Sequence, residues 1–114
     1  MVGIDVVAID RIEKAIENPR FVERVFTQKE YTYYKIHDKA ETLAGIYAAK
    51  EAFMKAFGNG VDVGVFHEIE VDHRESGAPF FSLSGRASAL AKGKKVYLSI
   101  SHDGGIAVAA VSVE

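Results

Sequence analysis

The sequence predicts an α+β fold, with helices from the first half of the chain packed on a mainly antiparallel sheet. Helix start and stop signals dominate residues 9–57. From residue 66 onward the apolar and polar residues alternate with a period of two, and Asp103-Gly104 is a strong signal for a hairpin turn. Helical segments followed by strand-like segments are typical of α+β domains.

The N-terminal quarter is predicted to form one strand and two short helices. Val2–Ala8 is rich in valine and isoleucine, as buried strands are, and Asp5 is its one charged residue. Ile9–Glu17 is compatible with a short helix that Asn18-Pro19 ends, because the residue before proline disfavours helical geometry. Arg20–Val25 is expected to form another short helical piece.

Two further helices are predicted before residue 58. Thr27 and Glu30 have the spacing of a capping box, so we expect a helix from there through about Ile36. Lys39–Phe57 is the long helix of the chain, and Gly58-Asn59-Gly60 is its expected C-terminal stop.

The second half is predicted to be mostly strands. A turn at Glu75–Pro79 separates the first two of them, and Arg86–Lys92 has the pattern of a short helix. The predicted strands are Phe66–Asp72, Phe80–Leu83, Lys95–His102 and Ile106–Val113.

Length and composition limit the possible classes of function. The 114 residues suffice for one domain, residues 1–114, and the net charge of -2 gives no support for nucleic-acid binding. Because cysteine is absent, disulfides, thiolate zinc sites and cysteine nucleophiles are excluded. No apolar run reaches about 18 residues and no signal-peptide pattern opens the chain, so we expect a soluble, cytoplasmic protein without a membrane partner.

The long predicted helix carries charge where its hydrophobicity predicts burial. Glu51 and Lys55 interrupt an apolar surface and lie one turn apart on the same face. One interpretation is an ordinary helix ion pair at the edge of a core. The other is a site for a metal and a phosphate, because a charge among apolar side chains is costly unless it has a partner.

Asp5 is unusual inside a strand of valine and isoleucine. Either the strand ends early and Asp5 caps the next helix, or its carboxylate holds a cation. Mg²⁺ takes one or two carboxylates and completes its shell with water and substrate phosphates. Asp5 and Glu51 supply such a set if the first strand and the long helix pack side by side.

Polar residues at the two ends of the chain allow two interpretations each. His102 faces away from Ser99 and Ser101 on its predicted strand. It either bonds a local carbonyl or forms, with Ser101, a phosphate or nucleotide contact. No serine has the strand–turn–helix context of a hydrolase nucleophile, so a serine triad is rejected.

Arg11 and Arg24 lie among acidic residues, which indicates a solvated surface by default and an acidic protein partner if both project from one side.

Four motifs occur in a fixed order along nearly the whole chain. They are Gly3-Ile4-Asp5 followed by Arg11; Leu43-Ala44-Gly45 with Ala48-Ala49-Lys50-Glu51-Ala52 and Lys55-Ala56-Phe57-Gly58; Gly77-Ala78-Pro79; and Leu98-Ser99-Ile100-Ser101-His102. Together they resemble the motifs of the holo-acyl-carrier-protein synthase family, the small 4′-phosphopantetheinyl transferases.

The resemblance implies a reaction and an assembly. The phosphopantetheine arm of coenzyme A is moved onto a serine of an apo acyl carrier protein, with release of adenosine 3′,5′-bisphosphate, in fatty acid and lipid biosynthesis. The resemblance also implies Mg²⁺ as cofactor and a homotrimer with sites at subunit interfaces.

The resemblance further implies roles for individual residues. Asp5 and Glu51 would hold the Mg²⁺, Glu51 would take the serine proton, and Lys55 would ease departure of the leaving group. The expected coenzyme A contacts are Lys55, Gly58, Pro79, Ser101 and His102. The expected carrier-protein contacts are Arg11 and Arg24.

One position departs from the family pattern, and two other functions stay open. Relatives usually have Arg-Phe after a Leu-Ala-Gly or Leu-Ala-Lys step, where this chain has Ile46-Tyr47. The same carboxylates would also suit a Mg²⁺-dependent nucleotide hydrolase that uses water as acceptor. The third possibility is a non-catalytic module that binds coenzyme A or a carrier protein.

Overall fold

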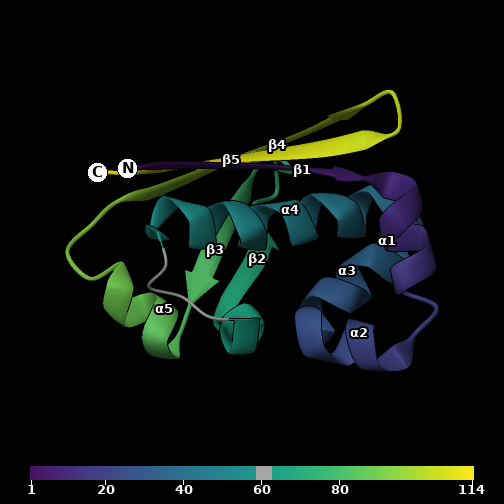
Figure 1. The fold of residues 1–114 in the computed structure, drawn as a ribbon, viewed down its shortest axis with the longest axis horizontal. Helices are drawn as coiled ribbons and strands as arrows, with labels where there is room; N and C mark the ends of the chain where they lie inside the picture. The colour runs from purple at the N-terminus through teal and green to yellow at the C-terminus, as the bar shows by residue number, and fades with distance from the viewer. Residues whose placement is uncertain (59–62) are drawn as a thin grey trace.

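The long helix α4 lies between a three-stranded sheet and a second layer formed by a hairpin and the shorter helices (Figure 1). The structure is a computed structural model that describes residues 1–58 and 63–114. The α+β fold predicted from the sequence is confirmed. Within these described residues, no helix is both long and apolar enough to cross a membrane.

The three-stranded sheet joins the two ends of the chain. It consists of β1 (Val2–Ala8), β4 (Val96–Asp103) and β5 (Ile106–Val113), in the order β1-β5-β4 with antiparallel neighbours. Asp5 pairs with Ala109, so the first strand does not end at the aspartate, and the capping interpretation of Asp5 is wrong.

The turn between β4 and β5 follows from two glycines. Asp103 pairs with Ile106, which leaves Gly104 and Gly105 as a two-residue loop with φ of 57° and 82°. Positive φ at both positions is the type I′ geometry that matches strand twist, and glycine reaches it without a steric penalty. The predicted hairpin turn is therefore confirmed.

The packing of β1 on α4 depends on a close backbone approach. Helix α4 (Ala40–Ala56) buries most of its surface, as its alanines and aromatics predict. A Cβ atom placed on Gly3 would lie 2.0 Å from the carbonyl oxygen of Ala52 and 2.6 Å from the backbone nitrogen of Ala56. No side chain fits in that space, so glycine at this position lets the strand lie directly on the helix, two residues before Asp5.

The opposite face of the three-stranded sheet is apolar and exposed. Helix α4 covers one face, and Figure 1 shows no described element over the other. The exposed large apolar side chains of this outer face are Val2, Ile4, Val6, Tyr97 and Ile106. Contiguous apolar surface of this kind on a small domain indicates an interaction surface.

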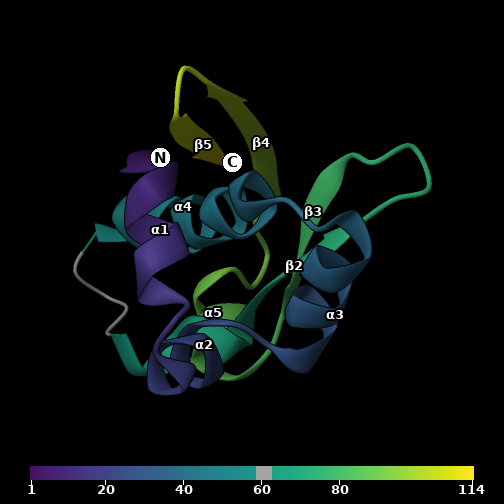
Figure 2. The ribbon, with the colours of Figure 1, turned by 90° about the vertical axis from the view of Figure 1, so that its right-hand side faces the viewer.

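The predicted helices of the first half are present. They are α1 (Ile9–Ala15), α2 (Pro19–Val25) and α3 (Gln28–His37). Both side chains of the predicted capping box make their bonds: the Thr27 hydroxyl accepts from the Glu30 amide, and the Glu30 carboxylate accepts from the Thr27 amide. Figure 2 shows α3 lying beside the second hairpin.

The second hairpin differs from its prediction at one end. Its strands are β2 (Ile69–His73) and β3 (Pro79–Leu83), and α5 (Gly85–Leu90) follows. The strand predicted from Phe66 is wrong over its first three residues, which belong to the 3₁₀ helix η2 (Val63–Glu68). Val65 and Phe66 are consecutive and both buried, and the Phe66 carbonyl turns toward a buried ammonium group, so the period-two pattern does not hold there.

The end of the long helix agrees with the expected stop where the structure describes it. Phe57 is the C-cap, and Gly58 has a φ of 69° in the left-handed region that favours glycine. Asn59 and Gly60, the rest of the predicted stop signal, lie outside the described residues.

Candidate active site

An ion pair between β1 and α4 lies at the centre of the candidate site. The Lys55 ammonium donates to Asp5 Oδ1 at 2.9 Å and to the Ile4 carbonyl oxygen at 3.2 Å. The Asp5 side chain is 13% exposed and that of Lys55 is 55% exposed. Lys55 thus pairs with a carboxylate fifty positions away along the chain. Helix spacing also allowed an ion pair with Glu51, but among the described residues Lys55 forms none with it.

Glu51 joins this group through Tyr47, one turn earlier on the same face of α4. Burial raises the pKa of the Tyr47 hydroxyl, and the negative charges of Glu51 and Asp5 raise it further. The charge of Arg11 acts in the opposite direction, and its guanidinium carbon lies 5.8 Å from the centre of the Tyr47 ring. Glu51 lies one turn before Lys55 on α4, so the helix places it on the same face as the ammonium group that pairs with Asp5.

The donor set of this neighbourhood is small. Across the part of the chain that the structure describes, no group of three or more His, Cys, Asp or Glu side chains has a metal-binding arrangement. Asp5 and Glu51 offer two carboxylates, which is the number that Mg²⁺ uses when phosphates and water complete its shell.

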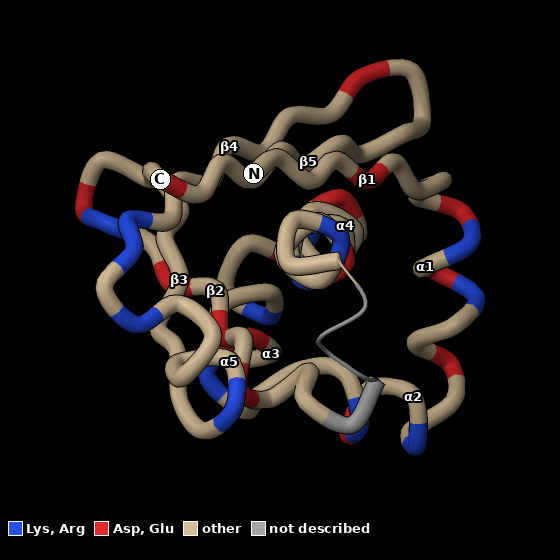
Figure 3. Tube along the Cα trace, turned by 60° about the vertical axis from the view of Figure 1, so that its left-hand side comes forward, with Lys and Arg blue, Asp and Glu red and all other residues tan. Residues whose placement is uncertain are grey.

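Two adjoining hollows lie on the Glu51 side of the candidate site. Glu51 and Arg24 line the smaller one, of about 240 Å³, together with Tyr47 and Phe66. The larger one has a volume of about 530 Å³, and its basic lining residues are Arg11, Lys14, Arg20 and Arg24. Arg11 and Arg24 thus do share one surface, although Figure 3 shows acidic residues interleaved with the basic ones along α1.

The expected nucleotide contacts lie elsewhere in the chain. Pro79 and His102 line a groove of about 300 Å³ with Glu41 and Thr42, at the N-terminal end of α4. His102 Nε2 is 3.9 Å from the Glu41 carboxylate. The groove follows α4 from Glu41 to Ile46, so with a rise of about 1.5 Å per residue its nearer end is roughly 14 Å from Lys55 along the helix. One chain therefore does not bring this groove and the ion pair together.

Three other predicted positions have distinct environments. Ser101 is exposed and belongs to the outer face of the sheet, opposite to His102, as strand alternation predicted. Gly58 is exposed at the end of α4. Ile46, at the position where the family resemblance implies an arginine, is 1% exposed and lines the His102 groove from the core side.

Comparison with known proteins decides the family. Residues 1–111 match the 4′-phosphopantetheinyl transferase superfamily. The chain belongs to this superfamily.

Relatives of this chain include several holo-acyl-carrier-protein synthases. The holo-acyl-carrier-protein synthase of Sulfurovum sp. (strain NBC37-1) is 42% identical over 116 residues, which cover 99% of this chain and 95% of the relative. The crystal structure of Helicobacter pylori holo-acyl-carrier-protein synthase in complex with coenzyme A has a TM-score of 0.87 and 35% identity, covering both chains fully. An ACPS–CoA complex from Chronobacterium ammoniagenes has a TM-score of 0.88 and 32% identity, over 99% of this chain and 95% of the other. The predicted family and the enzyme class, a phosphopantetheinyl transferase of the holo-acyl-carrier-protein synthase type, are thereby confirmed.

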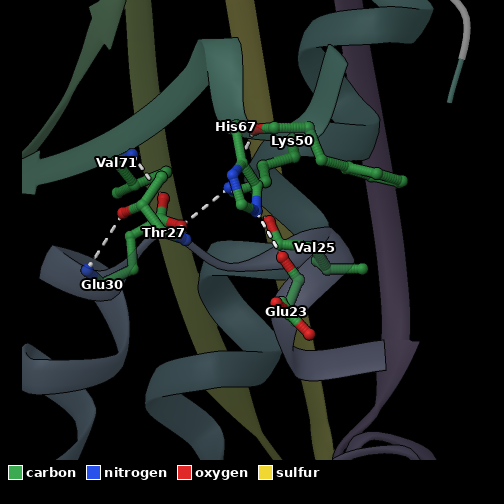
Figure 4. A network of polar contacts seen from close by, with 8 residues as sticks. Glu23, Val25, Thr27, Glu30, Lys50, His67 and Val71 are labelled. Carbon is green, nitrogen blue, oxygen red and sulfur yellow. Dashed lines mark hydrogen bonds and ion pairs between the residues drawn. The ribbon is translucent and has the colours of Figure 1, made fainter. Parts of the chain in front are cut away.

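Sequence reasoning missed one pair of charged residues of this transferase-family chain. Lys50 and Glu30 form a fully buried ion pair at 2.7 Å, with both side chains 0% exposed. The Lys50 ammonium also donates to the carbonyl oxygen of Val25 at 2.7 Å (Figure 4). It donates further to the carbonyl oxygen of Phe66 at 3.0 Å. All three of its protons therefore have an acceptor.

The carboxylate of this pair is equally satisfied. Glu30 accepts from the backbone amides of Thr27 and Val71, at 2.8 Å and 2.7 Å, in addition to Lys50. The available signal was Lys50 itself, a charge that follows two alanines and lies one turn before Phe53 on a helix that the sequence predicts to be buried nearly all round. Val25 and Phe66 also line the hollow of Glu51, so the buried pair fixes part of the wall of the site.

Proposed function

We propose that this chain transfers 4′-phosphopantetheine from coenzyme A to a serine of an apo acyl carrier protein and releases adenosine 3′,5′-bisphosphate. The observation that carries the proposal is the meeting of Asp5 and Lys55, beside Glu51, where β1 lies on α4. In a chain of this superfamily, two carboxylates and an ammonium at one place suit the handling of a diphosphate.

A divalent cation, Mg²⁺ by preference, fits the carboxylates of this site. The two side chains present only oxygen donors, Asp5 is partly exposed, and an ammonium already pairs with one of its oxygens, so the site favours positive charge. Asp5 and Glu51 would hold the cation. When bound, it supplies charge that offsets the negative charge developing on the diphosphate oxygens.

The residues of the chain account for the other requirements of the transfer. The serine oxygen of the carrier protein forms a bond to the phosphorus next to the pantetheine, and the bond from that phosphorus to the bridging oxygen breaks. Glu51 receives the serine proton, directly or through a water molecule. Lys55 lies one turn further along α4, where its ammonium group stabilises the leaving adenosine 3′,5′-bisphosphate.

We propose that the complete site needs more than one copy of the chain. Pro79 and His102 are expected to contact coenzyme A, yet in one protomer they line a groove far from Lys55. The apolar outer face of the sheet supports self-association, and Ser101 lies on that face. The family resemblance gives the number of copies as three, with sites at the subunit interfaces.

Tyr97→Glu is expected to break this assembly. Tyr97 is half-exposed on the outer face, so a charge there costs little in one chain and a great deal in an apolar interface. Sedimentation analysis should give about three times the mass of one chain for the unaltered protein and about the mass of one chain for the variant. Ile36→Glu, which replaces an exposed apolar residue on α3, is the matched control and should keep the assembly. Equal masses for Tyr97→Glu and the unaltered protein would contradict this interface.

The basic hollow beside Glu51 supports docking of an acidic carrier protein. Arg11 and Arg24, with Lys14 and Arg20, present positive charge next to Glu51, where the serine must arrive. Arg24→Glu should raise the KM for the carrier protein about tenfold and leave the KM for coenzyme A unchanged, because only the encounter with the carrier is affected. Lys94→Glu, a charge reversal after α5 and away from this hollow, is the control, and equal effects of the two variants would refute the docking surface.

The decisive assay for the whole proposal uses coenzyme A, Mg²⁺ and an apo carrier protein. A mass gain of one phosphopantetheine on the carrier is the expected result. Breakdown of coenzyme A without that gain would support the nucleotide hydrolase, and saturable binding without turnover would support the binding module. A role in fatty acid and lipid biosynthesis and a location in the cytoplasm belong to the same proposal, since fatty acid synthesis uses acyl carrier protein as its acyl carrier.

A further inference from the structure

We propose that Lys55 is a stand-in for the divalent cation. Without the cation, its ammonium group forms an ion pair with the Asp5 carboxylate. Cation binding breaks this ion pair and moves the ammonium group toward the phosphates of coenzyme A. The inference rests on the proposed function and names an additional role for a residue of the same site. It makes Lys55 the link between the binding of the cation and the binding of the anionic substrate.

The ion pair supplies the first part of the argument. Lys55 Nζ lies 2.9 Å from Asp5 Oδ1, and its second acceptor is the Ile4 carbonyl oxygen of the neighbouring residue. Asp5 is only 13% exposed, so a cation has few directions from which to reach its oxygens. A divalent ion on Asp5 would compete with the ammonium for the same lone pairs, and the two positive charges would repel each other at that distance.

The freedom of Lys55 supplies the second part. Its side chain is 55% exposed and extends from the last turn of α4, so the ammonium group can rotate away while the backbone keeps its place. The contact between β1 and α4 does not depend on this pair, because Gly3 packs directly on the backbone of Ala52 and Ala56. Displacement of Lys55 therefore needs no rearrangement of the fold.

Displacement of Lys55 should couple the affinity for the cation to the affinity for coenzyme A. An ammonium group released from Asp5 is placed at the same site as the diphosphate of coenzyme A, which attracts it. Cation binding should then strengthen coenzyme A binding, and coenzyme A should strengthen cation binding by the same factor, since coupling between two ligands is reciprocal. Part of this coupling should disappear when the side chain at position 55 has no charge.

The first test measures binding of Mn²⁺ alone, by the loss of the electron paramagnetic resonance signal of the free ion. Lys55→Met should bind Mn²⁺ about threefold to tenfold more tightly than the unaltered protein, because it removes a competitor and a repelling charge. Lys55→Arg keeps the charge and should stay within about twofold of the unaltered protein. Unchanged or weaker Mn²⁺ binding by Lys55→Met would overturn the stand-in role.

The second test separates this inference from the proposed function. Asp5→Asn should abolish Mn²⁺ binding, and if it does while Lys55→Met shows no gain, only the stand-in role falls. If Asp5→Asn binds Mn²⁺ as well as the unaltered protein, the proposed cation site falls as well. Repeating the titrations at saturating coenzyme A should show a smaller gain in Mn²⁺ affinity for Lys55→Met than for the unaltered protein, and an equal gain would exclude Lys55 as the link.

Discussion

Lys50→Met is expected to lower the free energy of unfolding by about 3–5 kcal/mol, the cost typical of removing one partner from a buried ion pair. The substitution leaves the Glu30 carboxylate fully buried without its cation. It also leaves the carbonyl oxygens of Val25 and Phe66 without the donor that holds them at 2.7 Å and 3.0 Å. Urea unfolding followed by circular dichroism measures the change.

The decrease in the free energy of unfolding caused by Lys50→Met should also depend on pH. Burial raises the pKa of Glu30 in the intact protein, and the charge of Lys50 opposes that rise. Without Lys50 the folded-state pKa rises further above the value in the unfolded chain. A carboxyl group with a raised folded-state pKa contributes stability at low pH, which is lost as the pH rises through that pKa. The variant should therefore be closer to the unaltered protein at about pH 5 than at about pH 8.

Two variants test whether this effect comes from burial of charge. Lys55→Met removes an exposed ammonium from the same helix and should cost no more than about 1 kcal/mol. The double variant Glu30→Gln with Lys50→Met removes both charges and should recover part of the stability lost in Lys50→Met alone. A Lys50→Met protein as stable as the unaltered one would show that this pair does not hold α3, α4 and η2 together.

Signals within a few neighbouring residues were sufficient to predict most of the fold from the sequence. The capping box at Thr27 and Glu30 and the glycine turn after Asp103 each act within a few residues, so the sequence alone predicts them correctly. The 3₁₀ helix over Val63–Glu68 was missed because the alternating pattern from Phe66 is local, whereas the ammonium that turns the Phe66 carbonyl comes from α4. A tertiary contact there decides the backbone conformation.

The site shows the same division between local and distant information. Helix spacing suggested an ion pair of Lys55 with Glu51, but the structure pairs Lys55 with Asp5, because the close approach at Gly3 brings β1 to that turn of α4. The importance of Lys50 was hidden because its partner Glu30 is twenty positions away and appeared to be fully used as a capping residue. Distances of this kind depend on packing, which periodicity does not encode.

Asp5→Ala and Glu51→Ala are each expected to reduce turnover in the carrier-modification assay at least about 100-fold, since each removes one of the two protein carboxylates proposed to hold the charge-neutralising cation. Their effects should not multiply in the double variant, because the two side chains act on one ion. Asp10→Ala, which removes an exposed carboxylate from the first turn of α1, is the matched control and should retain full turnover.

The variants at Asp5 and Glu51 must also be distinguished from damage to the fold. The Asp5 partner Lys55 is largely exposed, so loss of that pair should change the free energy of unfolding by no more than about 1 kcal/mol. A 100-fold loss of turnover with nearly unchanged stability therefore indicates chemistry, whereas normal turnover in either variant would overturn the assignment of both carboxylates. Mn²⁺ titration of the same variants adds a readout that does not depend on turnover: both should lose the tight site, while Asp10→Ala keeps it.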